Sequence, residues 1–221
     1  MMTDFTALHT ALTSFIEQQD RYNEAYGLFP DTYIRSYPQR TDCEVDERIL
    51  LSPELEYLYS HYEMLDEKAA GTLKLKNASV LIGDGILLSF AAPEHLYRQQ
   101  LGYRWIGDPA SPQESADWPP HHVVIAVYND DPIIVDTSQP GSAVYAAFEG
   151  GDPEPIAASL ADFFKALAIM IEGAFHWQGE IMDEKTEEVK AGYMESIQPR
   201  LQELLGETFM HHLLVYLSLR W

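Results

Sequence analysis

Two pairs of adjacent histidines are the side chains best suited to hold a metal ion, His121-His122 and His211-His212. His121-His122 opens a predicted strand, where neighbouring side chains point to opposite faces, so both could bind one ion only across a bulge. His211-His212 lies on a predicted helix, where residues i and i+1 do not face one another. We therefore interpret both pairs as surface or packed histidines, and we expect no metal and no other cofactor.

Cys43 is the single cysteine of the chain, and it is a poor candidate for a nucleophile. A catalytic thiol needs a base beside it, and the sequence around Cys43 offers none, although one of the eight histidines could approach it in space. We interpret Cys43 as a small packing residue. The chain also lacks a Walker loop, a dinucleotide-binding fingerprint, a Gly-x-Ser-x-Gly elbow and a His-Glu-x-x-His helix, so none of these catalytic or cofactor-binding motifs points to an enzyme class.

The charge balance restricts the kind of partner. Fourteen lysines and arginines stand against 35 aspartates and glutamates, which gives a formal net charge of -21. Such a surface repels a phosphate backbone and an anionic membrane, so we expect neither nucleic acid nor a membrane as a partner. A basic protein is the kind of partner that this charge favours.

The acidic residues include a long run without any lysine or arginine, from Trp105 to Phe164. If this run presents a binding surface, its carboxylates should lie at the ends of predicted hairpins, where side chains are exposed. The candidate partner-binding residues are Asp130, Asp131, Glu149, Asp152 and Glu154 in predicted turns, Asp136 at a strand end, and Trp118 and Tyr128 as exposed aromatic anchors. The alternative interpretation is a solvated acidic surface that only keeps the protein soluble.

The spacing of apolar residues, together with turn and capping residues, predicts the helices and strands that would position these side chains. An amphipathic helix over residues 4–25 is followed by a long connection over residues 29–47, and Ser52-Pro53 is typical of a helix start. Gly83-Asp84-Gly85 predicts a β-hairpin within residues 72–90, in which Leu73 and Leu75 alternate with lysines. The remaining expected elements are a short helix at 93–101, strands at 122–128, 132–136 and 143–148, a helix that begins at Ser159, and a helical extension over 181–221 that Gly206 divides. This order predicts an α+β fold with a mainly antiparallel sheet.

The cysteine count and the lack of a long apolar stretch predict the cellular location. A single cysteine favours a reducing compartment. The first basic residue is Arg21 and the apolar stretch Leu213–Leu219 is far too short to span a bilayer, so we expect no signal peptide and no membrane helix. We therefore expect a cytoplasmic protein.

Several motifs resemble the SUKH superfamily, also called the Smi/Knr family after fungal cell-wall assembly regulators. The similarity is carried by the strand that begins at His122, the stretch Asp131-Pro132-Ile-Ile-Val-Asp136, the Val144-Tyr145 strand, and Ile156-Ala-Ala-Ser159 at a helix start. Leu51-Ser52-Pro53 resembles the family's upstream helix, and Trp105-Ile106-Gly107 its central aromatic strand. Asp130 departs from the glycine that is usual in the family, and the extension after Gly173 has no counterpart in it.

The resemblance implies one SUKH-like domain over residues 1–221, with its core at about 50–173, a central antiparallel sheet flanked by helices, and no catalytic residue. Bacterial members of the family are similar to immunity proteins, which block a toxin that is often a nuclease. We therefore expect a non-enzymatic module that binds a basic toxin domain through its acidic surface. The alternatives are a small-molecule-binding protein or hydrolase with a pocket lined by Tyr, Trp and His, and an intracellular regulatory scaffold.

Overall fold

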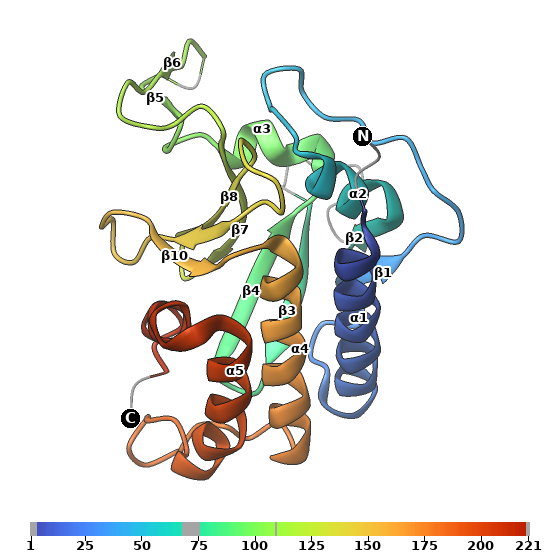
Figure 1. The fold of residues 1–221 in the computed structure, drawn as a ribbon, viewed down its shortest axis with the longest axis vertical. Coiled ribbons are helices and arrows are strands. Elements are labelled where there is room, and N and C mark those ends of the chain that lie inside the picture. Colours follow the sequence, from blue (N-terminus) through green and yellow to red (C-terminus); the bar gives the residue numbers. More distant parts are fainter. Residues whose placement is uncertain (1–3, 68–75, 109, 220–221) are drawn as a thin grey trace.

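The computed structural model describes residues 4–67, 76–108 and 110–219, and these residues form an α+β fold of a sheet and a layer of helices (Figure 1). The main sheet of the described residues has six strands, and every neighbouring pair is antiparallel. In spatial order the strands are β10 (Glu154–Ala157), β9 (Val144–Ala146), β8 (Asp131–Asp136), β7 (His122–Tyr128), β4 (Ile86–Ala91) and β3 (Asn77–Ile82). The predicted α+β fold with a mainly antiparallel sheet is therefore confirmed.

The long helices α1 (Thr6–Tyr26), α4 (Leu160–His176) and α5 (Ala191–Tyr216) lie side by side on one face of this sheet (Figure 1). The core between the two layers is rich in aromatic side chains. Phe164 of α4 packs against Phe15 of α1, with ring centroids 5.1 Å apart, and against Phe90 of β4 at 6.0 Å. Aromatic contacts of this kind add to the energy of apolar burial, so they stabilise the packing of α4 against both α1 and the sheet.

Two predicted helix starts are confirmed by their capping bonds. The Ser52 Oγ accepts a hydrogen bond from the Leu55 backbone N–H (3.2 Å) at the start of α2 (Pro53–His61). The Ser159 Oγ accepts one from the Asp162 N–H (3.1 Å) at the start of α4. Each cap satisfies a helical donor that would otherwise lack a partner. The short helix expected near 93–101 is present as η2 (Pro93–His95) and α3 (Leu96–Gln99).

The hairpin predicted around Gly83-Asp84-Gly85 is formed by β3 and β4, whereas its first expected residues, including Leu73 and Leu75, lie outside the described residues. The Asp84 carboxylate does more than close the turn. Its Oδ1 accepts hydrogen bonds from the backbone N–H groups of Ile181 (2.9 Å) and Met182 (3.0 Å). The start of the C-terminal extension is thereby tied to the sheet.

Three predictions about strands are wrong. The expected connection at 29–47 contains β1 (Thr32–Ser36), which pairs with β2 (Tyr62–Asp66), because the fully buried Ile34 gains its partners from distant residues rather than from a local pattern. Trp105-Ile106 is not a central strand, since β5 (Trp105–Ile106) pairs only with β6 (Gln113–Glu114) in a separate small sheet. The residues around Glu154, expected in a turn, form the edge strand β10.

The C-terminal extension is helical only from Ala191, where α5 begins, because residues 181–190 form turns and an isolated bridge between Met182 and Val189. As predicted, the extension divides at Gly206, whose φ of 76° and ψ of 168° interrupt α5. After Gly206 the helix runs under the β10 end of the sheet (Figure 1). The side chains that it buries there are Met210, Leu213, Leu214 and Tyr216. No helix in the described part of the chain combines the length and the apolar character that crossing a membrane requires.

We predict that deleting residues 207–221 yields insoluble or molten protein, because the deletion exposes the apolar surface that this segment covers. A milder change tests the same packing. Leu214→Ala should lower the free energy of unfolding by about 2–5 kcal/mol in urea denaturation, since it leaves a cavity. His211→Ala, on the exposed side of the same helix, should change it by less than about 0.5 kcal/mol. A truncated protein that stays soluble and melts cooperatively would show that this packing is dispensable.

Candidate functional site: an acidic hairpin end beside an apolar pocket

The turn between β7 and β8 and the loop between β9 and β10 lie at the same end of the sheet. β9 runs antiparallel to β8 with Ala146 opposite Ile133, so the chain leaves β9 beside the residues that begin β8. The carboxylate of Asp131 joins the two segments, because its two oxygens accept the Glu149 N–H at 3.0 and 3.1 Å. The structure therefore brings together five of the predicted partner-binding residues, which we call the acidic hairpin end: Asp130, Asp131, Glu149, Asp152 and Glu154.

The turn itself has the geometry of a tight two-residue hairpin connection. Asn129 and Asp130 have φ values of 49° and 68°, and Tyr128 pairs with Asp131. A turn with two positive φ angles matches the twist of its strands and favours Asn, Asp and Gly at both central positions. Asp130 thus serves two purposes, since its type suits the turn and its carboxylate is exposed to solvent.

Two tyrosines from other parts of the chain hold the backbone of this turn. The Tyr103 hydroxyl donates to the Asp130 carbonyl and the Tyr216 hydroxyl to the Asp131 carbonyl, each at 2.8 Å. Burial, followed by the nearby charge of Asp131, raises the pKa of both hydroxyls, so both remain protonated donors at neutral pH. These two hydrogen bonds therefore hold the backbone that carries the Asp130 and Asp131 carboxylates.

An apolar pocket of about 240 Å³ opens beside Asp152 and Glu154, between the β9–β10 segment and the last turns of α5. Phe148, Val215 and Tyr216 form part of its wall. His211 and His212 also border it, and the His212 Nδ1 lies 2.9 Å from the Pro155 carbonyl oxygen and 3.7 Å from the Glu154 Oε2. The predicted interpretation of this pair as surface or packed histidines agrees with these positions.

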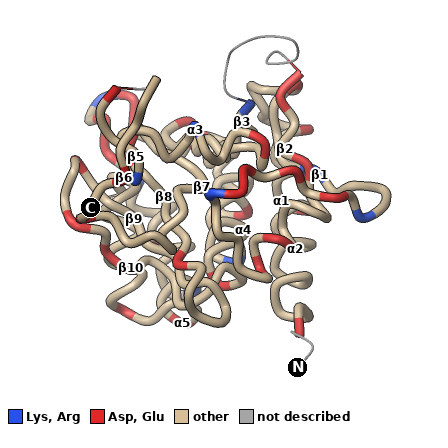
Figure 2. The backbone as a smooth tube through the Cα atoms, turned by 90° about the horizontal axis from the view of Figure 1, so that it is seen from above, with Lys and Arg blue, Asp and Glu red and all other residues tan. Residues whose placement is uncertain are grey.

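The chemistry of this site suits a long cationic side chain. Lysine and arginine carry apolar stems that can cover Phe148 and Val215, with a charged head that the carboxylates of Asp152 and Glu154 can meet. Figure 2 shows how few basic positions the backbone carries compared with acidic ones. The nearest basic residues along the sequence are Arg104 and Lys165, since the run between them contains none.

Three of the predicted partner-binding residues are less exposed than expected, although Asp136 is at a strand end as predicted. Asp136 is at the opposite end of β8 and buried, with 8% of its surface exposed, because the Ser138 N–H (2.8 Å) and Oγ (2.6 Å) enclose its Oδ1. Tyr128 is also buried, packed edge-to-face on Tyr216 with centroids 5.9 Å apart, so it is not an exposed anchor. Trp118 is half-buried and donates its Nε1–H to the His122 carbonyl (2.9 Å).

Asp136 instead meets His121 and His122 at the open end of the β7–β8 hairpin. One donor atom from each of the three side chains lies within 4.8 Å of the other two, and the His121 Nε2 is 3.7 Å from the Asp136 Oδ1. The expectation that the two histidines point to opposite faces is wrong, because β7 begins only at His122 and His121 lies in the preceding turn. We call these three residues the histidine–aspartate cluster.

The ionisation of this cluster is set by its surroundings. Burial lowers the pKa of His122, which favours the neutral imidazole, although the charge of Asp136 opposes this effect. For Asp136, burial alone would raise the pKa of the carboxyl group. The hydrogen bonds from Ser138 and the neighbouring histidines outweigh burial, so the pKa of Asp136 is lowered and the group is ionised at neutral pH.

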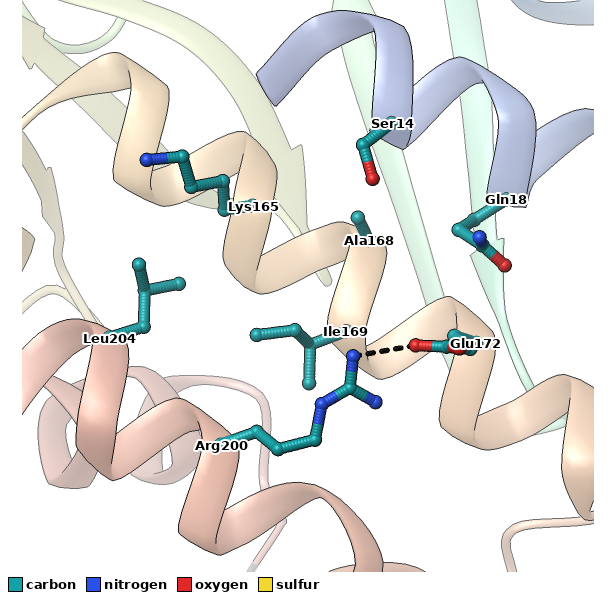
Figure 3. A pocket seen from close by; sticks show the side chains of 8 residues that line it. All are labelled: Ser14, Gln18, Lys165, Ala168, Ile169, Glu172, Arg200 and Leu204. Carbon is teal, nitrogen blue, oxygen red and sulfur yellow. Dashed lines mark hydrogen bonds and ion pairs between the residues drawn. The ribbon is translucent and has the colours of Figure 1, made fainter. Parts of the chain in front are cut away.

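A pocket of about 200 Å³ on the helical layer, shown in Figure 3, offers little to an anionic ligand. Its two cations are already engaged. The Arg200 Nη2 lies 2.6 Å from the Glu172 Oε2, and the Lys165 Nζ lies 3.6 Å from the Asp162 Oδ1. Neutralised cations hold a further anion weakly, so we do not place the functional site here.

No family model, no curated protein and no solved structure matches this chain. The resemblance to the SUKH superfamily therefore rests on the sequence motifs alone.

Asp130→Asn should leave the turn intact, because asparagine also tolerates a positive φ. Asp130→Ala should lower the free energy of unfolding by about 1–2 kcal/mol, because alanine lacks the short polar side chain whose local hydrogen bonds let Asp and Asn occupy the left-handed region. Urea denaturation of the two variants checks this difference. Equal stability of the Asn and Ala variants would contradict the assigned turn geometry.

Cys43 should react slowly with alkylating reagents. Burial first, and then the charges of Glu94 and Glu56, raise the pKa of its thiol to about 11, so only about one molecule in a thousand carries the thiolate at pH 8. The rate of reaction with iodoacetamide should rise about tenfold per pH unit between pH 7 and 10. A rate that levels off near pH 9, as expected for an ordinary free thiol such as glutathione measured in parallel, would mean that burial does not raise the pKa of Cys43.

Proposed function

We propose that this chain is a non-enzymatic binding module that recognises a basic protein through the acidic hairpin end, as an immunity protein recognises its toxin. The proposal is based on one observation: exposed carboxylates lie next to an apolar pocket on the same surface. Asp130, Asp152 and Glu154 supply negative charge, and Phe148 and Val215 supply apolar area. Binding sites combine these two elements because charge steers the partner to the site and buried anchors hold it there.

A nuclease toxin is the partner class that fits best. A nuclease binds phosphate with lysines and arginines, and a surface with carboxylates in place of phosphates can occupy the same groups. The overall charge of -21 would speed such an encounter. The motifs that resemble bacterial SUKH immunity proteins support the same class, and the raised pKa of the Cys43 thiol argues against this residue as a nucleophile.

The partner to test is a basic toxin domain from a gene adjacent to the gene of this chain, and the absence of such a gene would count against the immunity role. The domain is used as an inactive mutant for binding and as the active form for growth. The variant Asp130→Asn/Asp152→Asn/Glu154→Gln removes three charges at the site without straining the turn or releasing Glu149 from Asp131. Its matched control, Glu17→Gln/Glu24→Gln/Glu195→Gln, removes three exposed charges from α1 and α5. Stopped-flow association rates are measured for both across a range of ionic strengths.

We expect the site variant to associate at least about tenfold more slowly at low salt, with a weaker dependence on salt, while the control stays within about twofold of the parent protein. Val215→Lys, which fills the pocket with a cation of the chain itself, should mainly accelerate dissociation. The parent protein should also protect cells that produce the active toxin. Equal rates for the site variant and the control, or a parent protein that neither binds nor protects, would contradict the proposal and favour a regulatory scaffold or a hydrolase.

A further inference from the structure

We propose that the histidine–aspartate cluster binds one divalent transition-metal ion, of the Zn²⁺ class, at the end of the β7–β8 hairpin opposite to the acidic hairpin end. Two imidazoles and one carboxylate offer donor atoms within 4.8 Å of one another, a separation that a single ion can close with a small movement of the side chains. This is the one such group of His, Cys, Asp and Glu among the described residues.

The ladder between β7 and β8 places two of the three ligands. Starting from the pair Tyr128 and Asp131, an uninterrupted ladder would put Asp136 opposite Val123. A bulge between Val124 and Ala126 inserts one additional residue into β7, so Asp136 lies opposite His122 instead. Residues that are directly opposite in an antiparallel pair have side chains on the same face, so the bulge is what allows these two groups to meet.

His121 joins the pair from the turn that precedes β7. Its carbonyl oxygen accepts hydrogen bonds from the Thr137 N–H (2.9 Å) and from the Thr137 Oγ1 (3.0 Å), which fix its backbone beside the end of β8. Its side chain is 38% exposed, whereas that of Asp136 is 12% exposed. An ion could therefore enter from solvent on the His121 side.

Surrounding groups orient the ligands in the way that metal sites require. Ser138 holds one carboxylate oxygen of Asp136 with two hydrogen bonds, which leaves the other oxygen for an ion. The ring of His122 stacks on Tyr145 with centroids 5.4 Å apart, and the edge of Trp118 closes a second side at 6.3 Å. These contacts limit the rotation of the imidazole.

The His122 Nδ1 provides a second, independent observation. This nitrogen is buried and has no hydrogen-bond partner among the described residues. Buried polar atoms without a partner are uncommon in folded proteins, and each one requires an explanation. A metal ion on this nitrogen would supply the missing partner.

The ligand types determine which ions the site prefers. Imidazole nitrogens suit Zn²⁺, Cu²⁺ and Ni²⁺, whereas Mg²⁺ and Ca²⁺ prefer sites made only of oxygen. Three protein ligands leave a coordination position for water. A chain with a charge of -21 also attracts cations non-specifically. Binding of Zn²⁺ that persists in excess Mg²⁺ therefore distinguishes a specific metal site from non-specific counterion accumulation.

The test is calorimetric titration of the full chain with ZnCl₂ after treatment with a chelator, in the presence of millimolar Mg²⁺. We expect one Zn²⁺ per chain with micromolar or tighter affinity, and a higher melting temperature in its presence. His121→Ala, at a half-exposed position, and Asp136→Asn should each weaken binding by at least about tenfold. The control His211→Ala/His212→Ala removes the same kind of side chain elsewhere and should leave the affinity within about twofold.

Visible absorption of bound Co²⁺ gives a readout that does not depend on stability. The intense ligand-field bands of four- or five-coordinate Co²⁺ should appear with the parent protein and with the His211/His212 control, and they should be lost in His121→Ala. The proposal is overturned if the parent protein shows no saturable Zn²⁺ binding, if Mg²⁺ abolishes it, or if a folded His121→Ala variant binds as tightly as the parent.

Discussion

The register of β7 against β8 is the constraint on which both ends of this hairpin depend. The two-residue turn at Asn129-Asp130 fixes the pairing at one end, and the bulge next to Ile125 shifts the pairing at the other. The first feature exposes Asp130 beside the β9–β10 loop, and the second brings Asp136 to His122. Because side chains alternate along a strand, a shift of one residue would move every group of the shifted segment to the other face.

The position of β7 is maintained by a buried side chain where its neighbouring strand no longer pairs with it. β4 pairs with β7 only at Val127 and Ala126. Beyond that point the amide of Gln100 accepts the Val124 N–H and donates to the Val124 carbonyl, each at 2.8 Å. Gln100 thus replaces a missing strand, and losing it would leave buried backbone groups unpaired at a cost of about 1–3 kcal/mol each.

Local signals explain which parts of the structure could be predicted from the sequence. Ser52, Ser159 and the Gly83-Asp84-Gly85 turn act within a few residues, and each was placed correctly. The pairing of β1 with β2, the approach of Val215 to Glu154 and the meeting of His121 with Asp136 join residues that are distant in the sequence or depend on a bulge. The hydrophobic period of one segment says nothing about such distant contacts. The sequence therefore predicts the acidic turns but not the pocket beside them.

The proposed role of the acidic hairpin end in recognition depends on the hydrogen bonds from Tyr103 and Tyr216 that hold its turn. Hydrogen–deuterium exchange of the chain with and without a basic toxin domain that binds it tests this most directly, since it locates the contact without any substitution. We predict slower exchange in the complex at residues 129–131, 149–154 and 211–217, with the helical layer of α1 and α4 unchanged. Protection confined to the helical layer, with the acidic hairpin end exchanging as in the free chain, would contradict the account.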